Sequence, residues 1–119
     1  MKKKIISLLV CILLVTGCDR GSASYKTITE NIAHELILND AIIIDVRSSQ
    51  EYDTGHIIDA INIPVEKINS VDYDKEQIII VYCASGVRSA TAADTLVDLG
   101  YTNVYNLDGG LINWGSELE

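Results

Sequence analysis

Two short, strongly apolar runs constrain the fold of this chain more than any other feature. Residues 41–46 (AIIIDV) and 77–82 (QIIIVY) are rich in isoleucine and valine, and each spans only six residues, a length typical of strands. Runs of this kind are typical of parallel strands that are buried on both faces of a sheet. The segments between them show helical spacing, so we predict an α/β fold with a mainly parallel central sheet and helices on both faces.

The same patterns predict the other elements of the chain. Thr29 is a candidate N-cap for a helix over residues 30–38, with Ile28, Ile32 and Leu36 on its inner face. Ser48 can cap a short helix in the same way. We further predict helical segments at residues 48–52, 65–69, 88–99 and 111–118, and strands at residues 61–64 and 103–107.

The N-terminal segment has the pattern of an export signal. Three lysines at residues 2–4 precede an apolar run at residues 5–15, and small residues then lead to Cys18. The apolar run is shorter than the roughly 20 residues needed to span a bilayer. Residues 14–18 (LVTGC) resemble the lipobox of bacterial lipoproteins, and this resemblance implies that Cys18 is acylated and becomes the new N-terminus. The alternative is an ordinary signal peptide that is cut near a cysteine.

We therefore expect a signal peptide at residues 1–17, a lipidated cysteine with a short tether at residues 18–24, and one folded domain at residues 25–119. Such a protein lies outside the cytoplasm and is held to a bacterial membrane by its lipid. Asp19, directly after the lipidated cysteine, resembles an inner-membrane retention signal, which favours the inner or cell membrane.

The charge of the processed chain argues against a nucleic-acid partner. Removing residues 1–17 leaves six basic and 17 acidic residues, a net charge of −11. The phosphates of a nucleic acid would be repelled by this field. Nothing in the sequence calls for a partner subunit, so we expect a monomer.

The cysteine count leaves one thiol for the folded domain. Cys11 lies in the predicted signal peptide and Cys18 is assigned to the lipid, so only Cys83 remains. One cysteine can form neither a disulfide framework nor a cysteine-rich metal site, and we expect no metal and no organic cofactor.

Cys83 stands where a nucleophile would be activated. It follows the apolar run at residues 77–82 and precedes the helix predicted at residues 88–99. Backbone N–H groups at a helix N-terminus favour a thiolate over a thiol, and Gly86 allows the loop to curl so that several N–H groups converge. Arg88 adds a cation that binds a substrate or braces the loop. Cys83 is thus the predicted catalytic residue, and the predicted substrate-binding residues are Ala84, Ser85, Gly86, Val87 and Arg88.

This loop closely resembles that of the rhodanese family of sulfurtransferases, and three further motifs resemble the family in the same order. They are residues 44–47 (IDVR), residues 55–64 (GHIIDAINIP), and residues 107–110 (LDGG) with Trp114. The resemblance implies a rhodanese-like fold in which the Cys83 thiolate takes a sulfane sulfur from thiosulfate, a persulfide or a polysulfide. The Cys83 persulfide then passes this sulfur to a thiol, cyanide or sulfite.

Other functions remain open at this stage. Phosphatases and arsenate reductases of related architecture place five residues between the cysteine and the arginine, whereas four separate Cys83 from Arg88, and the tighter loop favours sulfur chemistry. A non-catalytic module could instead use the same loop to bind an anion or sulfide, or to scaffold a partner.

Several positions bear on how the site would work. Asp45 and Arg47 are predicted supporting residues, which either tune Cys83 or form a structural ion pair beneath the loop. Ala84 and Ser85 carry no charge where relatives devoted to thiosulfate often have basic residues, and Asp59 replaces the usual glycine of the family motif. The uncharged loop would disfavour anionic thiosulfate and suit a persulfide or a small thiol species. Asp59 would disfavour anions further if it lies near the mouth of the pocket.

Overall fold

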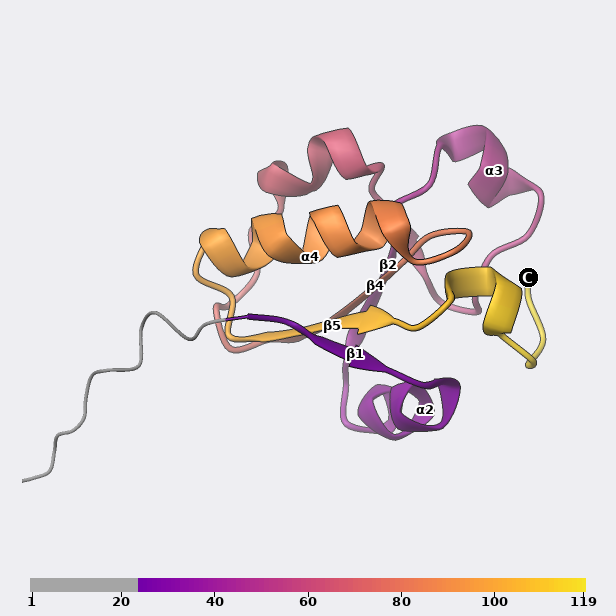
Figure 1. Cartoon of the computed structure of the whole chain (residues 1–119), viewed down its shortest axis with the longest axis horizontal. Coiled ribbons are helices and arrows are strands. Elements are labelled where there is room, and N and C mark those ends of the chain that lie inside the picture. Colours follow the sequence, from indigo (N-terminus) through magenta and orange to yellow (C-terminus); the bar gives the residue numbers. More distant parts are fainter. Residues whose placement is uncertain (1–23) are drawn as a thin grey trace, which may run out of the picture.

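The computed structural model describes residues 24–119, so the predicted signal peptide, Cys18 and nearly all of the tether lie outside the described residues. Five parallel strands form one sheet in the order β1-β5-β4-β2-β3 (Figure 1). The predicted α/β class with a parallel sheet is confirmed. The strands are β1 (Lys26–Ile28), β2 (Ile42–Asp45), β3 (Ile61–Asn62), β4 (Ile78–Tyr82) and β5 (Asn103–Leu107).

The central strand β4 shows why the sheet is covered on both faces. Ile79 and Val81 belong to one hydrophobic cluster, whereas Ile80 and Tyr82 belong to another. Successive side chains of a strand point to opposite faces, so each cluster lies on its own side of the sheet. All four side chains are at most 1 % exposed. Burying each such side chain contributes about 1.5–3 kcal/mol, which anchors the strand that leads directly to Cys83.

Helices cover both faces, as predicted. The helix α4 (Val87–Asp98) and the 3-10 helix η3 (Val65–Ser70) lie on one face, and α2 (Glu30–Leu38) lies on the other (Figure 1). The short helix α3 (Ser49–Asp53) and the 3-10 helix η4 (Gly110–Asn113) lie beyond the carboxyl ends of the strands. No helix within residues 24–119 has the length and apolar character needed to cross a membrane.

At the ends of the domain, one strand was missed and one helix prediction is wrong. The strand β1 was not predicted, because Lys26–Ile28 is too short to show a pattern and forms only by pairing with β5. The helix predicted at residues 111–118 is replaced by η4 and an extended segment. Gly109 and Gly110 both have positive φ, and Leu118 forms an antiparallel bridge with Ile57, so the end of the chain is held by tertiary contacts instead of helical hydrogen bonds.

The inner face predicted for α2 is also partly wrong. Ile32 is 41 % exposed, whereas its neighbour Ala33 is buried. Leu36 and Ile37 are half-buried against the same cluster as Ala33. Ile28 is buried as predicted, but it lies in β1 and not on the helix. The buried stripe of α2 therefore runs through Ala33, Leu36 and Ile37, and Leu36 is the predicted helix position that lies on it.

Candidate active site

Cys83 lies between the end of β4 and the start of α4, at the carboxyl edge of the sheet. Its Sγ atom accepts hydrogen bonds from the backbone N–H of Gly86 at 3.1 Å and of Ser89 at 3.4 Å. Cys83 is only 1 % exposed. Burial by itself raises the pKa of the thiol, but hydrogen bonds from the Ser89 hydroxyl and from the N–H groups of Ser89, Gly86 and Ser85 outweigh burial and lower the pKa below its usual value.

The loop is held in its curled shape by close backbone contacts. Gly86 has a φ of +102°, a conformation that favours glycine. Gly110 packs against the other side of the loop, where a Cβ atom would lie 2.2 Å from the carbonyl oxygen of Cys83. The N–H groups of Leu111 and Ile112 donate to the carbonyl oxygens of Cys83 and Ala84 at 3.0 and 3.1 Å. The glycine pair at the start of η4, Gly109 and Gly110, therefore allows this 3-10 helix to support the loop.

A buried polar network lies beneath the thiol. The Ser89 hydroxyl donates to Oδ1 of Asn106 at 2.6 Å, and its oxygen lies 3.5 Å from Sγ of Cys83. Nδ2 of Asn106 donates to the carbonyl oxygen of Gly86 at 3.2 Å, which fixes the orientation of the amide. Because the hydroxyl has a single proton, it can serve either Asn106 or a thiolate on Cys83, whereas the two backbone N–H groups serve the thiolate at all times.

Asp45 and Arg47 form a buried ion pair at the end of β2. Nη2 of Arg47 lies 2.7 Å from Oδ2 of Asp45, and the side chains are 7 % and 0 % exposed. Arg47 also donates to the carbonyl oxygen of Gly55 at 2.7 Å. The amide of Asn62 donates to the backbone carbonyls of both residues of the pair at 3.0 Å. This pair thus joins β2, β3 and the segment between them, and none of its side-chain hydrogen bonds reaches Cys83.

Arg88 is paired with a residue that the sequence reasoning did not single out. Its Nη1 and Nη2 atoms donate to the two carboxylate oxygens of Glu51 at 2.8 and 3.0 Å. Glu51 also completes a capping box with Ser48 at the start of α3. Arg88 first, and the capping N–H of Ser48 second, lower the pKa of Glu51 to about 2. Both side chains are about 40 % exposed, in contrast to the buried pair at the end of β2.

Three residues of the site were therefore missed: Glu51, Asn106, and Ser89, whose N–H and hydroxyl both lie next to Sγ of Cys83. Glu51 had a signal in the spacing of Ser48 and Glu51, which fits a capping box, but its contact with Arg88 joins residues 37 apart in the sequence. Asn106 is a polar residue in the apolar strand β5, and a buried polar residue of this kind needs a partner. No pattern in the sequence identifies Ser89 as that partner.

The remaining predicted positions are placed as follows. Val87 is 73 % exposed, and Ser85 is exposed on the same loop. Asp59 is exposed, has a positive φ, and donates its backbone N–H to Glu119 near the C-terminus. His56 stacks on Tyr52 with ring centroids 3.7 Å apart, which is a structural contact.

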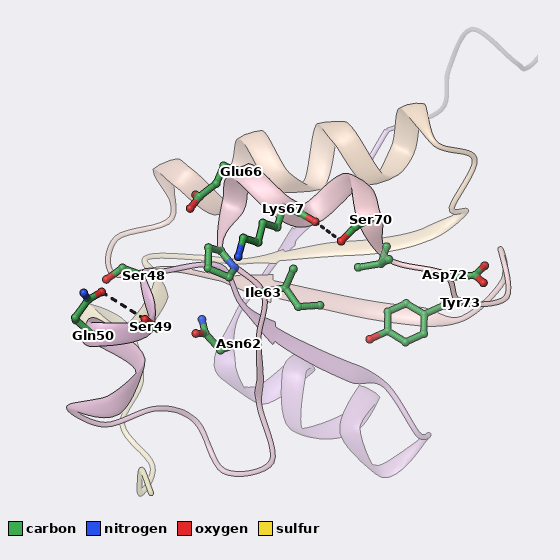
Figure 2. Close-up of a pocket in the computed structure, with 12 residues that line it drawn as sticks. Ser48, Ser49, Gln50, Asn62, Ile63, Glu66, Lys67, Ser70, Asp72 and Tyr73 are labelled. Atoms are coloured by element: carbon green, nitrogen blue, oxygen red, sulfur yellow. Dashed lines mark hydrogen bonds between the residues drawn. The ribbon is translucent and has the colours of Figure 1, made fainter.

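A polar groove opens between α3, the segment after β3, and η3 (Figure 2). Ser48 and Gln50 lie at one end of it and Tyr73 at the other, with Lys67 between them. Cys83 does not line this groove. Within residues 24–119, no group of three or more histidine, cysteine, aspartate or glutamate side chains could hold a metal ion.

Comparisons with known proteins agree on one family. The profile of the rhodanese-like domain matches residues 28–117. The thiosulfate sulfurtransferase GlpE of Coxiella burnetii is 38 % identical over 93 residues, which cover 76 % of this chain and 87 % of that protein. The uncharacterized protein YqhL of Bacillus subtilis is 39 % identical over 98 residues, covering 79 % and 75 % of the two chains.

Solved structures give the same result. A rhodanese-like domain protein from Staphylococcus aureus has a TM-score of 0.68 and 36 % identity, covering 79 % of this chain and 96 % of its own. A human single-domain sulfurtransferase has a TM-score of 0.69 and 27 % identity, covering 74 % and 93 %. The protein is an α/β domain with a cysteine loop at the carboxyl edge of a parallel sheet. It belongs to the rhodanese family, as the sequence motifs indicated.

Proposed function

We propose that this domain is a sulfurtransferase that moves a sulfane sulfur from a donor to a thiophilic acceptor through a persulfide on Cys83. The observation that carries the proposal is the position of Sγ, which receives the N–H groups of Gly86 and Ser89 at the start of α4. Because these hydrogen bonds lower the pKa of the thiol, they raise the fraction of the nucleophilic thiolate at a given pH. The name of the relative from Coxiella burnetii supports sulfur transfer as the reaction.

The reaction divides into two displacements. The Cys83 thiolate attacks the outer sulfur of the donor, the S–S bond of the donor breaks, and the leaving group departs with the electron pair as sulfite or a thiolate. The acceptor, which is a thiol, cyanide or sulfite, then attacks the outer sulfur of the Cys83 persulfide and regenerates the thiolate. The N–H groups of the loop, residues 84–88, would stabilise the negative charge on sulfur in both steps.

A sulfurtransferase assay with cyanide as the acceptor tests this proposal. We expect the protein to form thiocyanate with at least one sulfane donor, and the Cys83→Ala variant to form none. Ser70→Ala is a matched control, because Ser70 is exposed on η3 and only bonds a carbonyl within that helix. A folded protein that turns over no sulfane donor would contradict the proposal.

A non-catalytic module that binds an anion or sulfide is the second candidate. The observation that favours it is the 1 % exposure of Cys83, since a thiol that reacts must be reached by its donor. Alkylation of Cys83 by iodoacetamide separates the two functions. Rapid alkylation of the native protein supports the enzyme, whereas a thiol that reacts only after unfolding supports the binding module.

We further propose that the domain works outside the cytoplasm, attached to a bacterial membrane through lipid on Cys18. The support is the order of basic, apolar and small residues before this cysteine. In cells that produce the full chain, we expect the protein in the membrane fraction, and the Cys18→Ser variant without an acyl chain by mass spectrometry. A native protein that carries no lipid would refute the anchor.

A further inference from the structure

The two guanidinium groups at the carboxyl edge of the sheet are both bound to carboxylates. Arg47 is paired with Asp45 at 2.7 Å in the interior. Arg88, the only charged residue of the loop, is paired with Glu51 through two hydrogen bonds of 2.8 and 3.0 Å. Because Glu51 has a pKa of about 2, its carboxylate is ionised at neutral pH. The charge that Arg88 could offer to an incoming anion is therefore already compensated.

The side chains of residues 84–87 are uncharged, and one of them, Val87, is apolar and exposed. Ala84 and Ser85 follow Cys83 directly, and Val87 is 73 % exposed. Ile112 is 75 % exposed and lies beside the loop, since its N–H donates to the carbonyl oxygen of Ala84. Exposed apolar side chains thus stand on the loop and on η4, and the one charge of the loop is paired with Glu51.

We propose that Glu51 determines donor specificity: by pairing with Arg88 it disfavours dianionic donors such as thiosulfate, and the site takes sulfane donors of low charge that carry an apolar substituent. This inference rests on the proposed sulfurtransferase function. The repulsion between the Glu51 carboxylate and a donor scales with the product of their charges. A dianionic donor is therefore repelled twice as strongly as a monoanionic donor at the same position.

Two donors with the same reacting group allow a direct comparison. Thiosulfate is a dianion, whereas benzenethiosulfonate is a monoanion with an apolar ring. In both cases the Cys83 thiolate attacks the outer sulfur, the S–S bond breaks, and the electron pair leaves with sulfite or with benzenesulfinate. The product on the protein is the same Cys83 persulfide, so the second step is shared.

The decisive variant is Glu51→Gln. Glutamine can keep the capping box at the start of α3, so the fold is preserved while the charge is removed. We expect kcat/KM for thiosulfate to rise about fourfold and kcat/KM for benzenethiosulfonate to rise about twofold, since the first factor is the square of the second for a pure charge effect. Any change in the reactivity of the thiol itself affects both donors equally and cancels in their ratio.

Glu35→Gln is the matched control, because it removes the same charge from an exposed position on α2, across the sheet from α4. We expect neither donor to respond to it. At a salt concentration of about 1 M the screening length is about 3 Å. The increases in kcat/KM that Glu51→Gln causes for the two donors should then become more similar.

The outcomes separate this inference from the function on which it rests. A larger response of thiosulfate than of benzenethiosulfonate to Glu51→Gln supports the inference. Equal responses, or no response, in a protein that forms the Cys83 persulfide would overturn the role of Glu51 and leave the sulfurtransferase function standing. If neither donor produces the persulfide on the folded protein, the proposed function fails and the inference fails with it.

Discussion

Two arginine–carboxylate pairs flank the reactive loop, and they differ in burial although their chemistry is the same. The Asp45–Arg47 pair is almost completely buried, whereas the side chains of Glu51 and Arg88 are 38 % and 41 % exposed. Breaking a buried pair leaves an uncompensated charge in a medium of low dielectric constant. Breaking an exposed pair leaves two charges that water can solvate. The buried pair therefore stabilises the framework of the fold, whereas the exposed pair can set the electrostatic field at the substrate site with little effect on stability.

The largest expected effect comes from breaking the buried pair. Asp45→Asn keeps the size of the side chain but leaves Arg47 buried without a counter-charge. We expect the free energy of unfolding to fall by about 3–5 kcal/mol. Urea denaturation of the purified protein measures this directly. A loss below about 1 kcal/mol would show that the buried pair contributes no more to stability than a surface pair, which would contradict the difference drawn between the two pairs.

The next effect concerns the uncharged hydrogen-bond donors at the Cys83 thiol. Neither arginine–carboxylate pair forms a hydrogen bond with this thiol. Ser89→Ala removes the hydroxyl that lies 3.5 Å from Sγ of Cys83 and keeps the backbone N–H of residue 89. We expect alkylation of Cys83 at neutral pH to slow about tenfold, because a hydrogen bond to a charged group is worth about 1.5–3 kcal/mol. The rate of iodoacetamide modification as a function of pH checks this. An unchanged pH profile would mean that the backbone N–H groups alone lower the pKa of the thiol.

A smaller effect follows from loosening the cap that positions Glu51. Ser48→Ala removes the side chain that accepts the N–H of Glu51 at 3.2 Å. We expect a loss of about 1 kcal/mol in the free energy of unfolding, as for other N-cap serines. Ser49→Ala is the matched control, since Ser49 makes only an exposed contact with Gln50. Equal losses in the two variants would show that the cap contributes nothing.

The smallest effect on stability is expected from the exposed pair. Glu51→Gln should reduce the free energy of unfolding by no more than about 1 kcal/mol. Because the folded-state pKa of about 2 lies below the ordinary value of 4.5, the stability due to ionised Glu51 is present above pH 4.5 and is lost as the pH falls toward 2. Urea titrations of the two proteins should therefore converge at low pH. A difference that persists or grows there would contradict the assignment.

Elements that arise from local patterns could be predicted from the sequence, whereas elements that depend on distant contacts could not. The buried runs that became β2 and β4 and the spacing that became α4 are local patterns, and they gave the class of the sheet and the position of Cys83. The strand β1 depends on its pairing with β5, and the last segment depends on the bridge between Ile57 and Leu118. Such contacts between distant parts of the chain leave no periodic pattern.

The site divides in the same way. The loop from Cys83 to Arg88 is continuous in the sequence, so the position of its thiol between a strand and a helix could be predicted from the order of its residues. Glu51 and Asn106 reach this loop only in the folded chain, through Arg88 and Ser89 respectively. A sequence can identify the reacting group, but the charge and the hydrogen bonds around it depend on the tertiary structure.

The central claim is that Cys83 carries sulfur, and the mass of the intact protein tests it most directly. After incubation with benzenethiosulfonate and removal of the excess donor, we predict a gain of about 32 Da, the mass of one sulfur atom. The gain should be absent in Cys83→Ala and should disappear when cyanide is added to the loaded protein. A folded protein that never gains this mass with any sulfane donor would contradict the account.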